Sequence, residues 1–310
     1  HHLVEQTGGY NWLLKVENAQ ATVLDNTNHC YGFAFVILAY SWAYRAGVTE
    51  AREYLNDTFQ TMETHFWDAK AGLYKDQHNS DFTKCDSYRG QNANMHTCEA
   101  LIAAYEATRD EIFLNRALTL ADNMVNRQAS LMGGLIWEHY DINWQVDLEY
   151  NKDDPKNLFR PGGFQPGHQT EWSKLLMFLN KHKPQKWLIE RAQALFDNSI
   201  NVAWDKKHGG ICYGFAPDKT ICDDDKYFWV QAETLCCAAY LYQATGDEKY
   251  QQWYDKIWQY SWQHLVDHKY GAWFRILTAD NKKIDTMKSP IGKTDYHTMG
   301  ACFDVLELLK

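Results

Sequence analysis

A short loop signature recurs five times along this chain, and an internal repeat of this kind constrains the architecture more than any single motif. Each copy places a polar turn and a glycine close to aromatic residues. The intervals between the aligned glycines are 63, 62, 76 and 61 residues. These glycines are Gly9, Gly72, Gly134, Gly210 and Gly271. The spacing predicts one structural unit of roughly constant length, repeated through the molecule.

Between the loops, paired segments carry the helical period of apolar residues. The predicted pairs are 28–46 with 48–66, 92–108 with 110–127, 167–181 with 185–200 and 226–245 with 247–265, followed by a single helix at 294–309. The first helix of each pair is the more apolar or carries unusual polar residues, whereas the second has an ordinary solvated face. The sequence therefore predicts an all-α protein of nine helices, arranged as inner and outer layers.

Two architectures share this periodicity. An α/α toroid surrounds inner helices with outer ones and brings the starts of the inner helices together, whereas an open α-solenoid has shorter repeats and fewer buried polar residues. Aromatic residues make up 15% of the chain, with 13 Trp among them. Because aromatic rings offer flat apolar faces to sugars, this content favours a sugar-binding toroid, although most of the rings are expected to pack in the core.

Composition and charge narrow the choice of partner. A chain of 310 residues can bury a large core, and we expect one domain over 1–310. The net charge of −9, spread without long blocks of one sign, disfavours nucleic acid and anionic membranes. The longest apolar stretch, 30–44, is shorter than the roughly 20 residues that span a bilayer. A small neutral ligand is expected, with the protein a monomer or a homo-oligomer.

The cysteines and the start of the chain bear on the compartment. Eight cysteines occur without a C-x-x-C motif, so neither a zinc site nor a secreted disulfide framework is indicated. The chain shows no charged segment followed by a cleavable apolar one at its start, as a secretory signal would. Reduced buried thiols in a cytoplasmic protein without a bound metal are expected.

Three histidines, His96, His168 and His297, each begin a predicted inner helix. Imidazole is the side chain best suited to moving protons near neutral pH. Glu99 follows His96 and Glu171 follows His168 at a spacing of i,i+3, which places each pair on one helical face. One such histidine is more often a solvated or capping residue, but three at equivalent points of a repeat favour a proton-transfer site.

Four ordered blocks contain these histidines and further polar residues. They are 88–100 (YRGQNANMHTCEA), 160–172 (RPGGFQPGHQTEW), 229–235 (WVQAETL) and 295–300 (DYHTMG). Together they resemble the N-acylglucosamine 2-epimerase superfamily, and most of all its mannose isomerase and sulfoquinovose isomerase branch. The match runs along essentially the whole chain. The resemblance implies an (α/α)6 barrel that acts on free sugars, with no cofactor and no metal at the reacting carbon.

The resemblance also implies roles for individual residues. His168 and His297 would transfer protons on opposite sides of an open-chain sugar, supported by Glu171 and Glu233. Such a step needs a base at C2 of the sugar and donors that stabilise the charge developing on O1 and O2. The residues expected to bind the sugar are His96, which would assist ring opening, Arg160 and Arg89, which would polarise oxygens, and Asn92, Glu99, Trp172 and Trp229.

The chain departs from the family at its beginning. A twelve-helix barrel that starts with an outer helix and ends with an inner one should contain three helices before Leu3. At the start of this chain, only a loop over 3–14 is expected. The sequence therefore predicts a barrel that is open, or that is N-terminally incomplete in this numbering.

Four functions compete. The leading interpretation is an aldose–ketose isomerase of the D-mannose/D-fructose type that works through an enediol. A 2-epimerase acting on mannose or glucose, N-acylglucosamine or cellobiose would use the same residues. An α/α-barrel glycoside hydrolase needs two carboxylates facing each other across a glycosidic bond, and Glu99 and Glu171 instead lie beside histidines. A non-catalytic sugar-binding protein is the fourth possibility.

Overall fold

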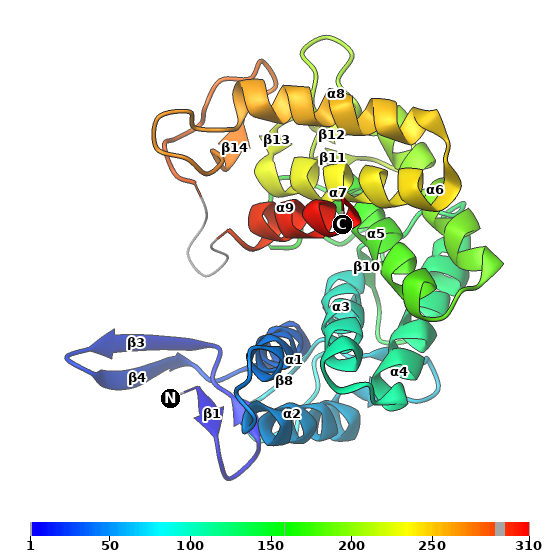
Figure 1. The fold of residues 1–310 in the computed structure, drawn as a ribbon. Helices are drawn as coiled ribbons and strands as arrows, with labels where there is room; N and C mark the ends of the chain where they lie inside the picture. Colours follow the sequence, from blue (N-terminus) through cyan, green and yellow to red (C-terminus); the bar gives the residue numbers. More distant parts are fainter. Residues whose placement is uncertain (1, 158, 289–294, 310) are drawn as a thin grey trace. The chain divides into compact units, whose positions relative to one another are not determined.

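The computed structural model describes residues 2–157, 159–288 and 295–309. Within these residues, nine α-helices alternate with short antiparallel pairs of strands (Figure 1). About half of the chain is helical, as the periodicity predicts. The residues form two compact units, which we call unit 1 (1–131 and 139–147) and unit 2 (132–138 and 148–310).

Unit 1 contains two inner and two outer helices. The helices are α1 (Cys30–Arg45), α2 (Ala51–His65), α3 (Gln91–Thr108), α4 (Glu111–Ala121) and the π-helical turn η1 (Asp122–Gln128). α1 packs on α3, and each of them is covered by the helix that follows it (Figure 1). α3 buries most of its residues and so belongs to the inner layer, whereas α2 buries only one face.

The strands of unit 1 are short, and each pairs either with the next strand in the sequence or with one that follows an intervening pair of helices. They are β1 (Leu3–Val4), β2 (Gly9–Tyr10), β3 (Leu13–Glu17), β4 (Gln20–Asp25), β5 (Asn28–His29), β6 (Trp67–Asp68), β7 (Leu73–Tyr74), β8 (Gln77–His78), β9 (Arg89–Gly90) and β10 (His139–Tyr140). The antiparallel pairs are β1–β2, β3–β4, β5–β8, β6–β7 and β9–β10. The expectation of a plain loop over 3–14 was wrong, because this segment contains one hairpin and begins a second. The second hairpin turns at Asn18 and Ala19, which both adopt positive φ (50° and 63°).

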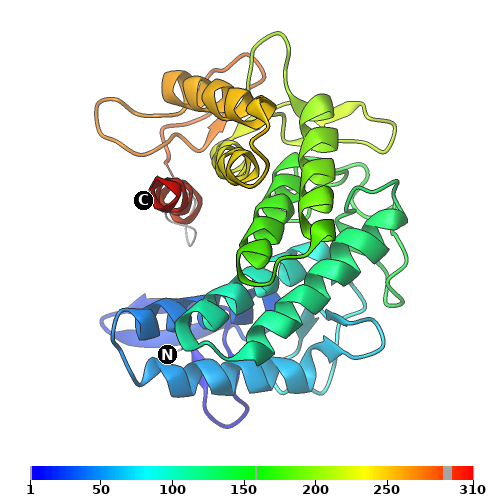
Figure 2. The same ribbon diagram turned by 45° about the vertical axis from the view of Figure 1, so that its right-hand side comes forward.

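Unit 2 repeats the same plan. Its helices are α5 (Pro166–His182), α6 (Lys186–Ala203), α7 (Phe228–Thr245), α8 (Glu248–His264) and α9 (Tyr296–Leu308), and its strands are β11 (Gly214–Phe215), β12 (Ile221–Asp223), β13 (Lys226–Tyr227) and β14 (Ile276–Leu277). α7 packs against α5 and α9, while α6 covers α5 and α8 covers α7 (Figure 2). β11 pairs with β12 and β13 with β14.

Local sequence signals set several helix ends. α7 ends at Gly246, whose φ of 68° is the left-handed conformation that closes many helices. The side chain of Asp247 then accepts a hydrogen bond from the Lys249 N–H and caps α8. Pro166 occupies the first turn of α5, where its missing N–H has no consequence.

Most predicted helix boundaries differ from the observed ones by a few residues, and two of the differences have a visible cause. α1 begins at Cys30 and not at 28, because Asn28 and His29 pair with Gln77 and His78 as strands. The predicted helix 110–127 is α-helical only to Ala121 and continues as η1, in which one residue more fits into a turn. Residue 294, the predicted start of the last helix, lies outside the described residues. Within the described ranges, no helix combines the length and the apolar character needed to cross a bilayer.

Four of the five copies of the recurring loop signature fold as a turn closed by a hairpin (β1–β2 and β6–β7) or by an isolated bridge (Trp204–Ile211 and Val266–Trp273). Four of its five aligned glycines, Gly72, Gly134, Gly210 and Gly271, have φ between 63° and 94°. At Gly210 the space is limited as well, since a Cβ would lie 2.5 Å from the ring of Tyr260. The repeat therefore depends on a left-handed backbone conformation at the turn, which residues other than glycine rarely adopt.

A buried amide side chain ties three of the inner helices to the loop before them. Asn94 of α3 exchanges two hydrogen bonds with the backbone of Tyr74, at 2.8 and 3.0 Å. Gln169 of α5 does the same with Ile136, at 2.9 and 2.8 Å. The third pair is Gln231 of α7 with Ile211, at 3.0 and 2.9 Å. Each amide satisfies one backbone N–H and one backbone C=O that are buried, and so fixes the start of its helix.

Candidate functional site

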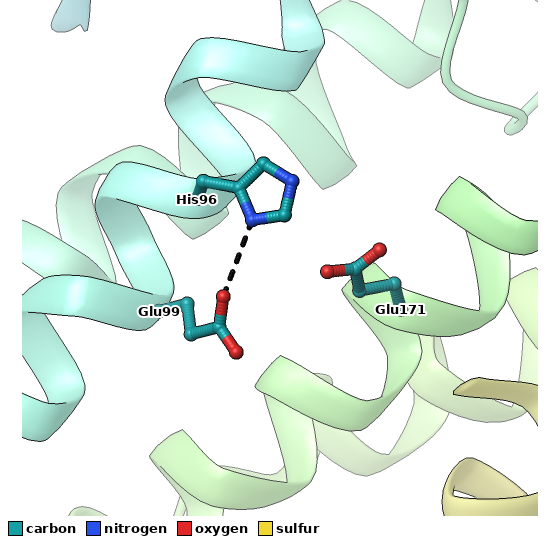
Figure 3. Close-up of side chains that lie close together, drawn as sticks. All are labelled: His96, Glu99 and Glu171. Atoms are coloured by element: carbon teal, nitrogen blue, oxygen red, sulfur yellow. Dashed lines mark hydrogen bonds and ion pairs between the residues drawn. The ribbon is translucent and has the colours of Figure 1, made fainter. Parts of the chain in front are cut away.

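His96 in unit 1 is held by one carboxylate and two rings. Its Nδ1 lies 3.2 Å from Glu99 Oε2, the partner that the i,i+3 spacing predicts (Figure 3). The rings of Tyr31 and Phe35, both on α1, lie 5.1 and 4.9 Å from the imidazole. The imidazole is only 4% exposed. A carboxylate on Nδ1 favours the tautomer that leaves Nε2 as the acceptor.

Two more predicted sugar-binding residues lie near the start of α3. The Arg89 side chain is buried and donates to the backbone oxygens of Asp86 and Tyr88, at 2.6 and 2.7 Å. These bonds hold its own loop. The Oδ1 atom of Asn92 is buried and accepts no hydrogen bond from the described residues. Their contacts with a sugar stay predictions.

His168 in unit 2 is oriented by a residue that the sequence did not identify. Its Nδ1 lies 2.9 Å from Oε2 of Glu138, which is 5% exposed. The i,i+3 spacing suggested Glu171 as a carboxylate partner of His168. The structure places Glu138 at Nδ1, and the supporting role of Glu171 stays a prediction. Glu138 belongs to the loop before α5, the loop that Gln169 holds through Ile136. The hydrogen-bonded carboxylate again favours the imidazole tautomer with a free Nε2.

His297 in unit 2 has a similar arrangement, extended by a cation. Its Nδ1 lies 2.7 Å from Glu233 Oε1, and the other oxygen of Glu233 accepts from Lys174 Nζ at 2.5 Å. All three side chains are at least 95% buried. Burial raises the pKa of Glu233, but Lys174 and His297 together lower it well below its usual range. Glu233 is therefore ionised, and His297 donates its Nδ1–H to it.

Trp229 of α7 lies against both histidines of unit 2. Its ring centroid is 5.1 Å from that of His168 and 5.5 Å from that of His297, with interplanar angles of 35° and 33°. Gly167 makes this packing possible, because a Cβ there would lie only 2.4 Å from the indole ring. The two imidazoles consequently share one apolar wall. This grouping agrees with the predicted pairing of His168 with His297.

Glu171 lies close to the same group. It offers one carboxylate oxygen within 4.8 Å of donor atoms of Glu233 and His297, a set of ligand types that divalent metals use. Both oxygens of Glu233 are already held by Lys174 and His297, however, and the Lys174 ammonium would repel a metal ion. The chemistry of these donors therefore fits a proton-transfer network better than a metal centre.

The remaining two predicted residues of unit 2 lie in different surroundings. Trp172 on α5 has no exposed surface, so its indole packs in the protein core and presents no open ring face. The position does not support the sugar contact predicted for it. Arg160 lies in the loop before α5, where its Nη1 donates to the Tyr150 hydroxyl at 3.0 Å. Its role in polarising a sugar oxygen stays a prediction.

Two important residues of this site were missed from the sequence. Lys174 reads as an ordinary helix cation, and nothing in its spacing shows that it meets Glu233 on another helix. Glu138 follows Trp137 in the third loop signature, and its polarity in an aromatic loop was the only available signal. Both contacts join segments that are distant in the sequence, at separations of 59 and 30 residues.

Comparison with known proteins identifies the family of this chain. A sequence model of the N-acylglucosamine 2-epimerase (GlcNAc 2-epimerase) family matches residues 1–301. The chain belongs to this family. The predicted resemblance is thereby confirmed over nearly the whole sequence.

Individual members of the N-acylglucosamine 2-epimerase family agree with this placement. D-mannose isomerase from Marinomonas mediterranea is 55% identical over 305 residues, which are 98% of this chain and 76% of the relative. A crystal structure of a D-mannose isomerase superposes with a TM-score of 0.95 at 54% identity, covering 99% of this chain and 78% of that one. Cellobiose 2-epimerase from Bacillus thermoamylovorans shares the fold at a TM-score of 0.84 and 20% identity, over 99% of this chain and 78% of that one. The fold is that of the (α/α)6-barrel epimerases and isomerases, as predicted.

Proposed function

We propose that this protein is an aldose–ketose isomerase that interconverts D-mannose and D-fructose through an enediol. The observation that carries the proposal is the pair of histidines in unit 2. Each has Nδ1 on a buried carboxylate, and both pack on Trp229. The 55% identity to a protein named D-mannose isomerase supports the choice of sugar.

The proposed reaction moves one proton from C2 to C1 and one from O2 to O1. One neutral imidazole takes the proton from C2 of the open-chain aldose on its Nε2, and the electron pair forms the C1–C2 double bond. The other neutral imidazole takes the proton of O2 and passes it to O1, and the first imidazole returns its proton to C1, which gives the ketose. His168 and His297 are proposed to act on opposite sides of the sugar, with neutral imidazoles that work near neutral pH. Glu171 is proposed to hold a hydroxyl or support His297.

Supporting roles complete the proposal. His96, with its Nδ1 on Glu99, is proposed to assist ring opening, while Arg89, Arg160 and Asn92 bind sugar oxygens and Trp229 packs on the sugar. Donors of this kind stabilise the charge that develops on the enediolate. We also propose one α/α-barrel domain over 1–310, monomeric or homo-oligomeric, in the cytoplasm, where its eight free cysteines would stay reduced.

Incubation with single sugars tests the function. D-mannose should give D-fructose, and D-fructose should give D-mannose. NMR or chromatography of the sugars measures both conversions. D-glucose, cellobiose and a 6-sulfonated hexose serve as competing substrates. Failure to convert D-mannose while another of these sugars reacts would overturn the substrate and leave the enediol chemistry standing.

A 2-epimerase is the second candidate, because the matching family is named for that reaction. Epimerisation also removes the C2 proton, but returns a proton to C2 from the opposite face. D-mannose would then give D-glucose. The ratio of fructose to glucose formed at early times therefore separates the two activities.

A further inference from the structure

Lys174 is a buried cation in contact with the acid that orients His297. It lies in the middle of α5, where it is 4% exposed. Lysine is almost never buried to this degree unless its charge is paired. It pairs with Glu233 on α7, and the Nζ–Oε2 distance of 2.5 Å is short even for a charge-assisted hydrogen bond.

The two oxygens of Glu233 have separate partners. One accepts from Lys174, and the other lies 2.7 Å from the Nδ1 of His297. Three side chains from α5, α7 and α9 thus form one continuous line. Because a single carboxylate joins the other two groups, a change of charge at Lys174 alters the protonation equilibrium of His297.

We propose that Lys174 is a positioning residue for the isomerisation: it holds Glu233 in place and offsets that carboxylate's attraction for a second imidazole proton, so that the imidazole of His297 remains neutral. The inference rests on the proposed function, in which His297 exchanges a proton with the sugar.

The charge balance of the line supports this role. With Lys174 protonated, Glu233 ionised and His297 neutral, the three groups sum to zero. Removing the cation would leave one buried negative charge, which uptake of a proton by His297 would neutralise. Burial disfavours net charge, so loss of Lys174 should move protonation of His297 to higher pH by roughly one unit or more.

Other titratable groups surround the line. They are Glu171 on α5, Asp197 on α6, Cys236, Cys237 and Tyr240 on α7, and Asp304 and Glu307 on α9. Burial raises the pKa of Cys237 to about 12 and that of Cys236 well above its usual value, so both thiols are neutral. These acids are the same in every Lys174 variant, so the comparison of Lys174→Met with Lys174→Arg reports the charge at position 174.

The test compares Lys174→Met, which keeps the length of the stem without its charge, with Lys174→Arg, which keeps the charge. The imidazole titration of His297 is followed by NMR and assigned from the spectrum of His297→Asn. The pH profile of kcat/KM is measured on the same samples. In Lys174→Met the His297 midpoint and the acidic limb should both rise by about one unit, which lowers the rate on that limb roughly tenfold. In Lys174→Arg the His297 midpoint and the acidic limb should stay at their wild-type positions.

A matched control removes a buried ion pair elsewhere in unit 2. Lys226 is fully buried, with its Nζ 2.7 Å from Asp205 Oδ2. Lys226→Met should lower the thermal midpoint and leave the His297 titration in place. Should Lys174→Met not fold, Lys174→Gln replaces it, since glutamine keeps a donor for Glu233 without the charge.

Two results would overturn the inference: a His297 midpoint in the uncharged variants equal to that of the wild type, or one that moves equally in Lys174→Arg. The NMR titration needs no substrate. A wild-type protein that fails to convert D-mannose would therefore contradict the proposed function, while the titration would still decide the role of Lys174.

Discussion

Glu138 reaches His168 from the preceding loop, and its carboxylate lies 2.9 Å from the imidazole Nδ1 although 30 residues separate the two in the chain. The loop that carries Glu138 is itself fixed to α5 by Gln169, the residue after His168. The orientation of the histidine therefore depends on a loop and a helix that are joined at two neighbouring points.

Glu138→Gln should lower kcat by about 10- to 1,000-fold with little change in KM, because an amide no longer fixes the tautomer of His168 or stabilises its protonated form. Circular dichroism should show an intact fold. Glu149→Gln is the control, since Glu149 is an exposed acid that pairs with an exposed lysine. Equal activity of Glu138→Gln and wild type would contradict the assignment of Glu138.

His168→Ala and His297→Ala should each reduce turnover by roughly 10²–10⁴-fold, since each removes a group that acts in the proton-transfer step. The thermal midpoints should stay close enough to the wild type that both proteins are folded at the assay temperature. Near-normal turnover in either variant would end the two-histidine mechanism.

Helix positions and the histidines could be predicted because both depend on local patterns. The period of apolar residues is written within each helix, and His96 with Glu99 lies on one helical turn. The pairing of His168 with Glu138 depends on how a loop folds back, and a sequence spacing carries no information about that. The spacing on the helix pointed to Glu171, and for the same reason it could not indicate that Glu138 lies at Nδ1.

Turnover in deuterated water tests the enediol. Products should gain solvent deuterium at C1 or C2, because a proton held on an imidazole exchanges with solvent, whereas a hydride shift would transfer the substrate hydrogen intact. Activity should be unaffected by EDTA. Loss of activity with EDTA and its recovery with a divalent ion would instead assign a metal to the donors around Glu171.

Two glycines of the repeat offer a matched test of stability. Gly210 and Gly271 have nearly the same φ, 78° and 77°, but a Cβ at Gly210 would lie 2.5 Å from the Tyr260 ring, whereas nothing lies within 4 Å at Gly271. Gly271→Ala should cost about 1–2 kcal/mol from the left-handed backbone alone. Gly210→Ala should cost a further 1–3 kcal/mol or so from overpacking. Urea unfolding of both variants measures the difference, and equal losses would contradict the steric argument.

α9 presents an apolar stripe to solvent. Met299, Phe303 and Leu306 are 49%, 61% and 55% exposed, and their spacing places them on one face. A protein consisting of residues 1–310 should therefore self-associate as its concentration rises. Phe303→Ser should weaken this association in sedimentation experiments. Ile112→Ser, at an exposed apolar position on α4, should leave it unchanged.

The hairpin of β3 and β4 shows the other limit of prediction. Its two positive-φ turn residues are Asn18 and Ala19, and alanine there gives none of the usual signal for a tight turn. The sequence contained the alternation needed for strands, but no glycine marked the reversal. Glycine signals were reliable in four of the five repeated loops, where the aligned glycine has positive φ.

The amide side chains of Asn94, Gln169 and Gln231 have a consequence for how this scaffold tolerates change. Each one fastens its helix to the turn immediately before it, so the placement of the neighbouring histidine or tryptophan is settled inside a single repeat. A displacement of the backbone in one repeat would therefore not be passed on to the side chains of the next repeat. Loops elsewhere in the protein can then lengthen or diverge, as the one interval of 76 residues among intervals near 62 illustrates, while reactive groups separated by more than a hundred residues keep their registration.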